Sequence, residues 1–146
     1  MDDHINNLYE ADFYLWIHRQ AELLQAQNFE QLDLLNLIEE IEAMGISQKH
    51  ELVHRLEKLL MHLLKFKLQP DHITGSWIRT IIEQRRRIKH SLKKMPSLRP
   101  QFDDCMAQAY QHAKWLAALE TGLPLSAFPA SNPFSSRQVL DTNFFP

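Results

Sequence analysis

The sequence predicts an all-α fold: a single compact bundle of about five main helices, followed by an irregular Pro- and Phe-rich tail that carries a short helix. Apolar residues recur with the helical period of 3.6 in five segments. The chain has only three glycines in 146 residues, which argues against a turn-rich β-sandwich. Its 45% hydrophobic content can supply a core. We expect one domain over residues 1–146, with the bundle core at 8–126 and the tail at 127–146 packed over it.

Two helices are predicted in the first third of the chain, over residues 8–26 and 34–44. Each presents an apolar face, and the aromatic-rich face of the first helix should dock. The face of the first helix comprises Tyr9, Phe13, Trp16, Ile17, Leu23 and Leu24. The face of the second comprises Leu34, Leu37, Ile38, Ile41 and Met44. Asp33 suits the N-cap of the second helix, and Gly45 suits the left-handed residue that ends it.

Three longer helices and one short helix follow. The third is predicted to begin at Ser47 and to end before Pro70, and the fourth begins at residues 74–76 and ends before Pro96. The fifth covers about residues 101–120 and stops at Gly122. Ser135 is a candidate N-cap for the short helix of the tail.

Charge is sorted along the chain. Residues 1–46 hold ten acidic residues and one basic residue, a balance of −9, whereas residues 47–100 have a balance of +9. Opposite charges in one chain can neutralise each other on folding, or one can bind a partner. We expect the two segments to lie against each other in the folded chain. The net charge of −2 argues against a general affinity for nucleic acids.

Cysteine usage and hydropathy indicate the compartment. The single cysteine, Cys105, excludes an internal disulfide and fits a reducing environment. The acidic N-terminus does not resemble a signal peptide, and no apolar stretch is long enough to cross a bilayer. We therefore expect a cytoplasmic protein without membrane contact. No cofactor is expected, because neither a glycine-rich phosphate loop nor a pair of nearby cysteines occurs.

One short motif matches a known metal site. His50, Glu51 and His54 form an HExxH pattern, which in zinc proteases places two ligands and a general base on one helix face. Here both histidines lie opposite the leucine stripe of the predicted third helix and should face solvent. The residues that would continue a metzincin motif are Glu57 and Leu60, in place of Gly and His. His50 and His54 are therefore only weak candidates for metal binding, and no metal is expected.

Polar residues near apolar stripes form a second group of candidates. Glu39, Glu40 and Glu42 could serve acid–base chemistry together with His62, or could pair with the basic fourth helix. Glu51–His54 is the single Glu-x-x-His pair, so the repeated pattern of a di-iron bundle is missing. Arg85 falls inside the apolar arc of the fourth helix and must be paired there. We expect a partly buried network between Arg85 and a carboxylate, with Glu40 or Glu42 as the partner.

Several blocks in order resemble one bacterial family. They are LYEADFYLWIHRQAELL, FEQLDLLNLIEEIEAMG, LEKLLMHLLKF, SWIRTIIEQRRRI, PSLRP, LETGLPLSAFP and NPFSSRQVLD. Over about residues 8–142 the chain is similar to the domain-of-unknown-function family twenty-nine, which is mostly cyanobacterial and proteobacterial. The resemblance implies a helical single domain and no established activity. Matching positions are Glu39, Glu40, Glu42, His62, Trp77, Arg79, Gln84 and Arg85. All of these except Trp77 are expected to form a polar network or pocket. The family's usual tail Cys is Asn132 here.

Three functions stay open at this point. The first is a non-enzymatic helical module that binds an unidentified protein or a second copy of itself. The second is a small metal-dependent or acid–base enzyme that uses the region of Glu39, Glu40, Glu42 and His62. The third, which the charge balance favours least, is a nucleic-acid-associated regulator using the basic residues between Arg86 and Lys94.

Overall fold

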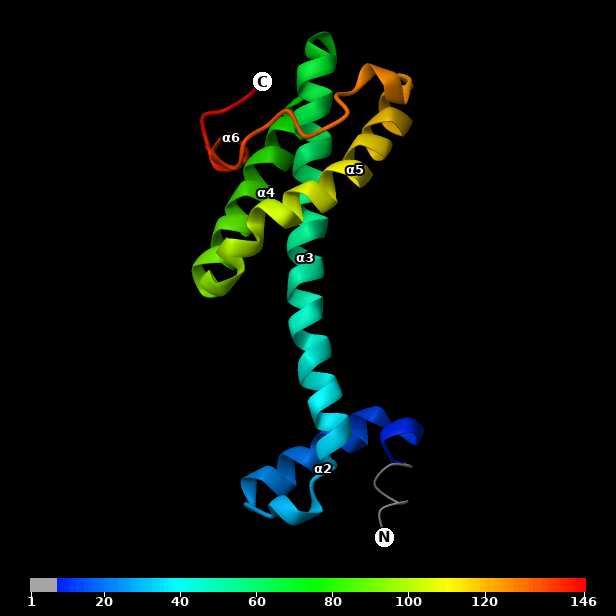
Figure 1. Ribbon diagram of the computed structural model, residues 1–146, viewed down its shortest axis with the longest axis vertical. Helices are drawn as coiled ribbons and strands as arrows, with labels where there is room; N and C mark the ends of the chain where they lie inside the picture. Colours follow the sequence, from blue (N-terminus) through cyan, green and yellow to red (C-terminus); the bar gives the residue numbers. More distant parts are fainter. Residues whose placement is uncertain (1–7) are drawn as a thin grey trace. The chain divides into compact units, whose positions relative to one another are not determined.

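The structure, a computed structural model, describes residues 8–146 (Figure 1). A helical turn at residues 8–11 precedes the main helices. These are α2 (Phe13–Gln25), α3 (Leu34–Leu68), α4 (Gly75–Lys94), α5 (Phe102–Thr121) and α6 (Ser136–Leu140). The structure is 81% helical, and no strand occurs in residues 8–146, which confirms the predicted all-α class. Within the same residues, no helix combines the length and apolar character needed to cross a bilayer.

Contacts group the chain into two compact units, and the single domain expected over residues 1–146 stays a prediction. The first ends at Ser47, and its described residues, 8–47, are called the hairpin unit. The second covers residues 48–146 and is called the bundle unit. The boundary between them falls inside α3. Each unit has buried side chains of its own, so each is stabilised by its own packing.

The hairpin unit consists of α2 and the first part of α3, joined by a short 3₁₀ helix. Asp12 caps α2, because its carboxylate accepts a hydrogen bond from the Leu15 amide at 3.0 Å. This cap separates residues 8–11 from α2, whereas the sequence predicted one helix over 8–26. Trp16 Nε1 donates to Asp33 Oδ2 at 3.0 Å, and the Asp33 amide donates to Gln20 Oε1 at 2.8 Å. The start of α3 is thereby tied to α2.

Within the hairpin unit the predicted apolar faces are mostly exposed, and their docking against another surface stays a prediction. Of the face predicted on α2, only Trp16 and Leu23 are buried. On the predicted second face, Leu34, Ile41 and Met44 are each at least 60% exposed. Periodicity identifies the apolar side of a helix, but it does not show whether another element covers that side.

α3 continues through Gly45, so the two helices predicted at 34–44 and 47–69 are one. Gly45 does not adopt the left-handed conformation, and no neighbouring atom lies within 4 Å of a Cβ built on it. A helical glycine costs about 1 kcal/mol relative to alanine. Good helix formers on both sides outweigh that cost. Glycine is compatible with the end of a helix but does not force the helix to end there.

The two glycines at issue should respond oppositely to replacement by alanine. Gly45→Ala should raise the free energy of unfolding by about 1 kcal/mol, because the site is helical and uncrowded. Gly122→Ala should lower it by about 1 kcal/mol, because Gly122 ends α5 at φ +74°. Urea unfolding of the two variants beside the unmodified chain measures both shifts. Equal signs for the two variants would contradict the assignment of Gly45 to a helix interior.

In the bundle unit, α4 lies along the C-terminal part of α3, and α5 crosses both (Figure 1). The core is built mainly from leucines of α3, isoleucines of α4 and small residues of α5. Its fully buried members include Leu56, Leu59, Leu60, Leu63, Leu64, Ile81, Ile88, Cys105, Ala109, Ala113 and Ala117. The alanines let the helices approach closely along part of α5, and Phe102, Met106 and Tyr110 fill the core elsewhere on the same helix.

The C-terminal tail packs over this core. Phe128, Phe134 and Val139 belong to the buried cluster, and the Tyr110 hydroxyl donates to the Pro129 carbonyl. As predicted, a short helix follows Ser135, which caps α6 in a reciprocal capping box with the side chain of Gln138. The tail thereby closes one side of the bundle unit and presents backbone carbonyls to α4.

Candidate functional site

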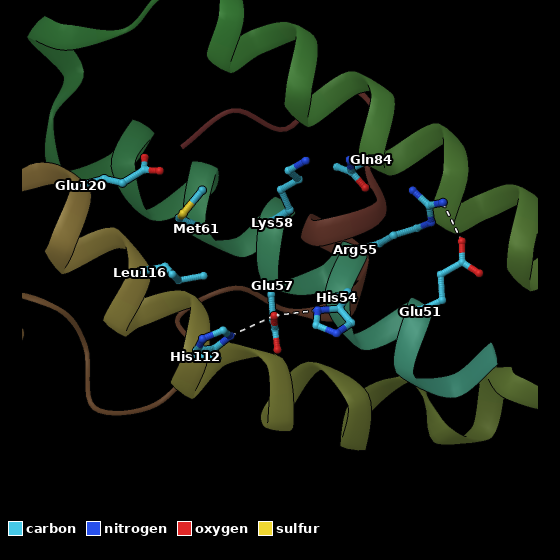
Figure 2. Close-up of a pocket in the computed structure, with 10 residues that line it drawn as sticks. All are labelled: Glu51, His54, Arg55, Glu57, Lys58, Met61, Gln84, His112, Leu116 and Glu120. Atoms are coloured by element: carbon cyan, nitrogen blue, oxygen red, sulfur yellow. Dashed lines mark hydrogen bonds and ion pairs between the residues drawn. The ribbon is translucent and has the colours of Figure 1, made fainter. Parts of the chain in front are cut away.

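A pocket of about 540 Å³ opens in the bundle unit between α3, α4 and α5 (Figure 2). Eight of the ten residues that line it are polar or charged, and Met61 and Leu116 add an apolar area. The lining residues are Glu51, His54, Arg55, Glu57, Lys58, Met61, Gln84, His112, Leu116 and Glu120. Six of these ten belong to consecutive turns of α3, so the helical register of α3 sets most of the pocket's chemistry.

Glu57 lies between two imidazoles, as Figure 2 shows. Its Oε2 is 3.3 Å from His54 Nδ1 and 3.0 Å from His112 Nδ1. The Glu57 side chain is 13% exposed, whereas those of His54 and His112 are 75% and 50% exposed. With a proton on Nδ1, each ring donates to the carboxylate and keeps Nε2 free as an acceptor. Glu57 thus orients both rings and joins α3 to α5.

Two buried polar atoms at the pocket have no hydrogen-bond partner in the described part of the chain. They are Arg55 Nε and Gln84 Oε1. Arg55 uses Nη2 to bind Glu51 Oε1 at 2.7 Å, which leaves its Nε–H free. Burying such a group without a partner costs about 1–3 kcal/mol. The pocket therefore favours an occupant that offers an acceptor to Arg55 and a donor to Gln84.

Beside the pocket, the grooves between α3 and α4 are mainly cationic. Their cationic side chains are Arg55, Lys58, Arg79, Arg86, Arg87 and Lys94. Glu83 pairs with Arg86 Nη2 at 2.8 Å and Arg87 Nε at 2.6 Å. These two guanidinium groups lower the pKa of Glu83 to about 2. Lys58 and Arg79 make no ion pair among residues 8–146, so their charges are available to a partner.

The two histidines of the HExxH motif lie in different surroundings. His50 is exposed and does not line the pocket, whereas His54 lines it and contacts Glu57. Within residues 8–146, no three side chains of His, Cys, Asp or Glu gather closely enough to hold a metal ion. The solvent-facing positions predicted for both histidines agree with the structure. The carboxylate partner of His54 was not predicted, although the i,i+3 spacing to Glu57 could have indicated it.

His62, Arg79 and Gln84 occupy three different environments in the bundle unit. His62 is buried, and its Nδ1 lies 2.8 Å from the Lys58 carbonyl oxygen. Burial lowers the pKa of His62, because the charged imidazolium loses its hydration. Arg79 is exposed on α4 beside the pocket, and Gln84 is buried at the pocket wall.

Arg85 is buried as predicted, but it binds carbonyl groups in place of the expected glutamate. Its Nε donates to the Val139 carbonyl at 2.8 Å, and its Nη2 donates to the Gln138 carbonyl at 3.2 Å. The last carbonyls of a helix have no partner within that helix, so the end of α6 supplies acceptors. The Phe145 ring lies 5.4 Å from the guanidinium carbon. Burial lowers the pKa of Arg85, and the nearby Asp141 opposes that shift.

The acidic cluster belongs to the hairpin unit. The Tyr9 hydroxyl donates to Glu40, and this contact raises the pKa of Tyr9 to about 12. Glu39 and Glu42 are exposed. The sequence suggested Glu40 as a partner for His62 or Arg85. In the structure its carboxylate instead accepts a hydrogen bond from Tyr9 within the hairpin unit.

A second concave site lies in the hairpin unit, between α2 and the first part of α3. This groove has a volume of about 380 Å³ and is almost entirely apolar. Its lining residues are Phe13, Trp16, Ile17, Gln20, Ala21, Leu24, Leu37, Glu40, Ile41 and Met44. Phe13, Ile17, Leu24, Ile41 and Met44 are each at least 43% exposed, so the groove presents apolar area to its surroundings.

One protein-family comparison identifies the chain. The family model described as domain of unknown function DUF29 matches residues 8–145. This chain belongs to the DUF29 family. The resemblance seen in the sequence is thereby confirmed, and the match includes both the pocket and the groove of the DUF29 chain. No curated protein and no solved structure matches it.

Proposed function

We propose that this DUF29 chain is a helical protein-interaction module, and that its hairpin unit binds an amphipathic helix of a partner protein. The groove between α2 and α3 receives the apolar side of that helix. Cys105 is a free, buried thiol, which fits a reducing compartment. We therefore place the protein in the bacterial cytoplasm, as the sequence suggested.

The exposed apolar area of the hairpin unit supports this function. Sixteen large hydrophobic side chains are exposed in the described residues, and twelve of them belong to this unit of about forty residues. They are Phe13, Tyr14, Leu15, Ile17, Leu24, Phe29, Leu34, Leu35, Ile38, Ile41, Met44 and Ile46. Contiguous apolar patches on soluble proteins typically mark interaction surfaces.

Charge specifies the chemistry of the partner helix. Residues 1–47 carry ten acidic side chains and one basic side chain, a balance of −9. A partner with Leu or Ile on one side and Lys or Arg on its flanks would match both the apolar groove and the surrounding negative potential. A second acidic hairpin would meet like-charge repulsion in the same position.

Binding of two model peptides tests the proposal. A synthetic amphipathic helix of leucine and lysine should bind the full chain, and the same peptide with glutamate in place of lysine should bind at least about tenfold more weakly. Fluorescence anisotropy of labelled peptides measures both affinities. Ile41→Ser, in the groove, should weaken binding of the lysine peptide by roughly tenfold.

The matched control is Leu125→Ser, which also removes an exposed aliphatic side chain but lies in the bundle unit. It should leave the affinity for the lysine peptide unchanged. Equal binding of the two peptides, or an equal effect of Ile41→Ser and Leu125→Ser, would contradict docking in the groove.

A further inference from the structure

We infer that a second copy of this chain occupies the pocket between α3, α4 and α5, by inserting the outer ridge of its own α3. The outer ridge is defined by Leu35, Ile38, Glu39, Glu42 and Ile46. This contact is separate from the proposed function, because the groove between α2 and α3 uses other residues of the hairpin unit.

The ridge has the form of a docking helix. Its residues follow the spacing i, i+3, i+4, i+7 and i+11, which places them on one face of α3. Leu35 is 81% exposed and Ile46 is 57% exposed, although both are large aliphatic residues. Glu39 and Glu42 lie between them and are also exposed. The ridge therefore combines aliphatic anchors with acidic side chains.

The pocket offers a complement to each component of the ridge. Met61 and Leu116 form an apolar area that can receive a leucine or isoleucine side chain. Arg55 Nε is a buried donor without a partner in the described residues, and a glutamate carboxylate would accept its hydrogen bond. Lys58 and Arg79 are exposed beside it and can attract the second glutamate.

The carboxylates around the pocket already have partners, so they oppose the ridge only weakly. Glu51 binds Arg55 at 2.7 Å, and Glu57 lies 3.0–3.3 Å from the two histidines. Glu120 binds Lys65 Nζ at 2.6 Å. The groups left without partners among the described residues are mainly donors and cations. A carboxylate-bearing occupant therefore gains more contacts there than a cationic one.

Overall charge favours a second copy as the occupant. The bundle unit has a balance of +7 and residues 1–47 a balance of −9. Another copy of the chain supplies this complementary surface at equal concentration. A nucleic acid fits less well, because Glu51 and Glu83 interrupt the row of cations along the grooves between α3 and α4.

Sedimentation of two charge-reversed variants tests the contact. Variant one carries Lys58→Glu and Arg79→Glu, which reverse the pocket edge, and variant two carries Glu39→Lys and Glu42→Lys, which reverse the ridge. The unmodified chain should self-associate, more weakly at high salt. Each variant alone should associate roughly tenfold more weakly, because two attractive pairs become repulsive. An equimolar mixture should recover the association, because the ridge of each variant matches the pocket of the other.

The control carries Lys114→Glu and Arg137→Glu, the same change of charge away from the pocket edge, and should associate like the unmodified chain. Circular dichroism confirms that every variant keeps its helix content. A monomer at all concentrations, a mixture that does not recover association, or normal association of variant one would overturn the inference. So would tight binding of a random oligonucleotide that prevents self-association. Peptide binding in the groove is measured in a separate experiment. The proposed function and the inferred self-association can therefore be contradicted independently of each other.

Discussion

Replacing Arg85 by alanine should lower the free energy of unfolding of the bundle unit by about 3 kcal/mol. The guanidinium is 1% exposed and donates to two carbonyls at the end of α6. A hydrogen bond from a charged group contributes about 1.5–3 kcal/mol, and its loss leaves the buried Val139 carbonyl without the Arg85 donor, whereas the Gln138 carbonyl still accepts from the Asp141 amide. The change also removes the contact with Phe145, so the tail should detach from α4 before the rest of the unit unfolds.

Thermal unfolding, together with amide exchange over residues 136–146, measures this effect. A loss of about 3 kcal/mol corresponds to a fall in the Tm of the bundle unit of roughly 12–24 °C, because the unit has about 100 residues. Arg85→Lys keeps the charge but lacks the planar fork, so its stability should lie between those of the unmodified chain and Arg85→Ala. If Arg85→Ala melted within about a degree of the unmodified chain, Arg85 would not hold the tail.

Replacing Trp16 by alanine should unfold the hairpin unit while the bundle unit stays folded. Trp16 and Leu23 are the only buried hydrophobic residues among residues 8–47. Truncating a buried tryptophan costs about 3–5 kcal/mol, a large share of what so small a unit can supply. The change also removes the donor that binds Asp33 at the start of α3.

Amide hydrogen exchange resolved along the chain distinguishes the two units. In Trp16→Ala, the amides of α2 should lose their protection, whereas those of α4 and α5 should keep it. Tyr14→Ala is the matched control, since this neighbouring aromatic is 74% exposed and its removal should change little. Loss of protection in both units together would show that they unfold as one.

The predicted helix ends illustrate which local features can be read from sequence. Thr74, Ser135 and Gly122 were expected at helix ends, and the structure places all three there. Their effect is local, because a capping side chain or a left-handed glycine acts within one turn. The helix end predicted at Gly45 was wrong. A glycine backbone is compatible both with a C-cap and with a helix interior, so the residue alone does not decide between them.

The candidate site was only partly predictable. Gln84 and His54 were named from the sequence, and both line the pocket. His112 was not named as a candidate, because it lies on α5 and contacts Glu57 of α3 only through the packing of the two helices. The partner of Arg85 was wrongly predicted, because the sequence shows carboxylates but not which backbone carbonyls a fold leaves unpaired. The pairing of the acidic first segment with the basic middle segment stays a prediction.

The sequence by itself determined the all-helical class, most helix ends, the sorted charges and the need to pair Arg85. These properties follow from apolar periodicity, capping residues and composition, which act over a few residues. Tertiary structure alone decided that α6 supplies the acceptors for Arg85, that Glu57 joins two histidines, and that Trp16 of α2 binds Asp33 at the start of α3. Those outcomes depend on which elements pack together, and long-range packing is a property of the whole chain.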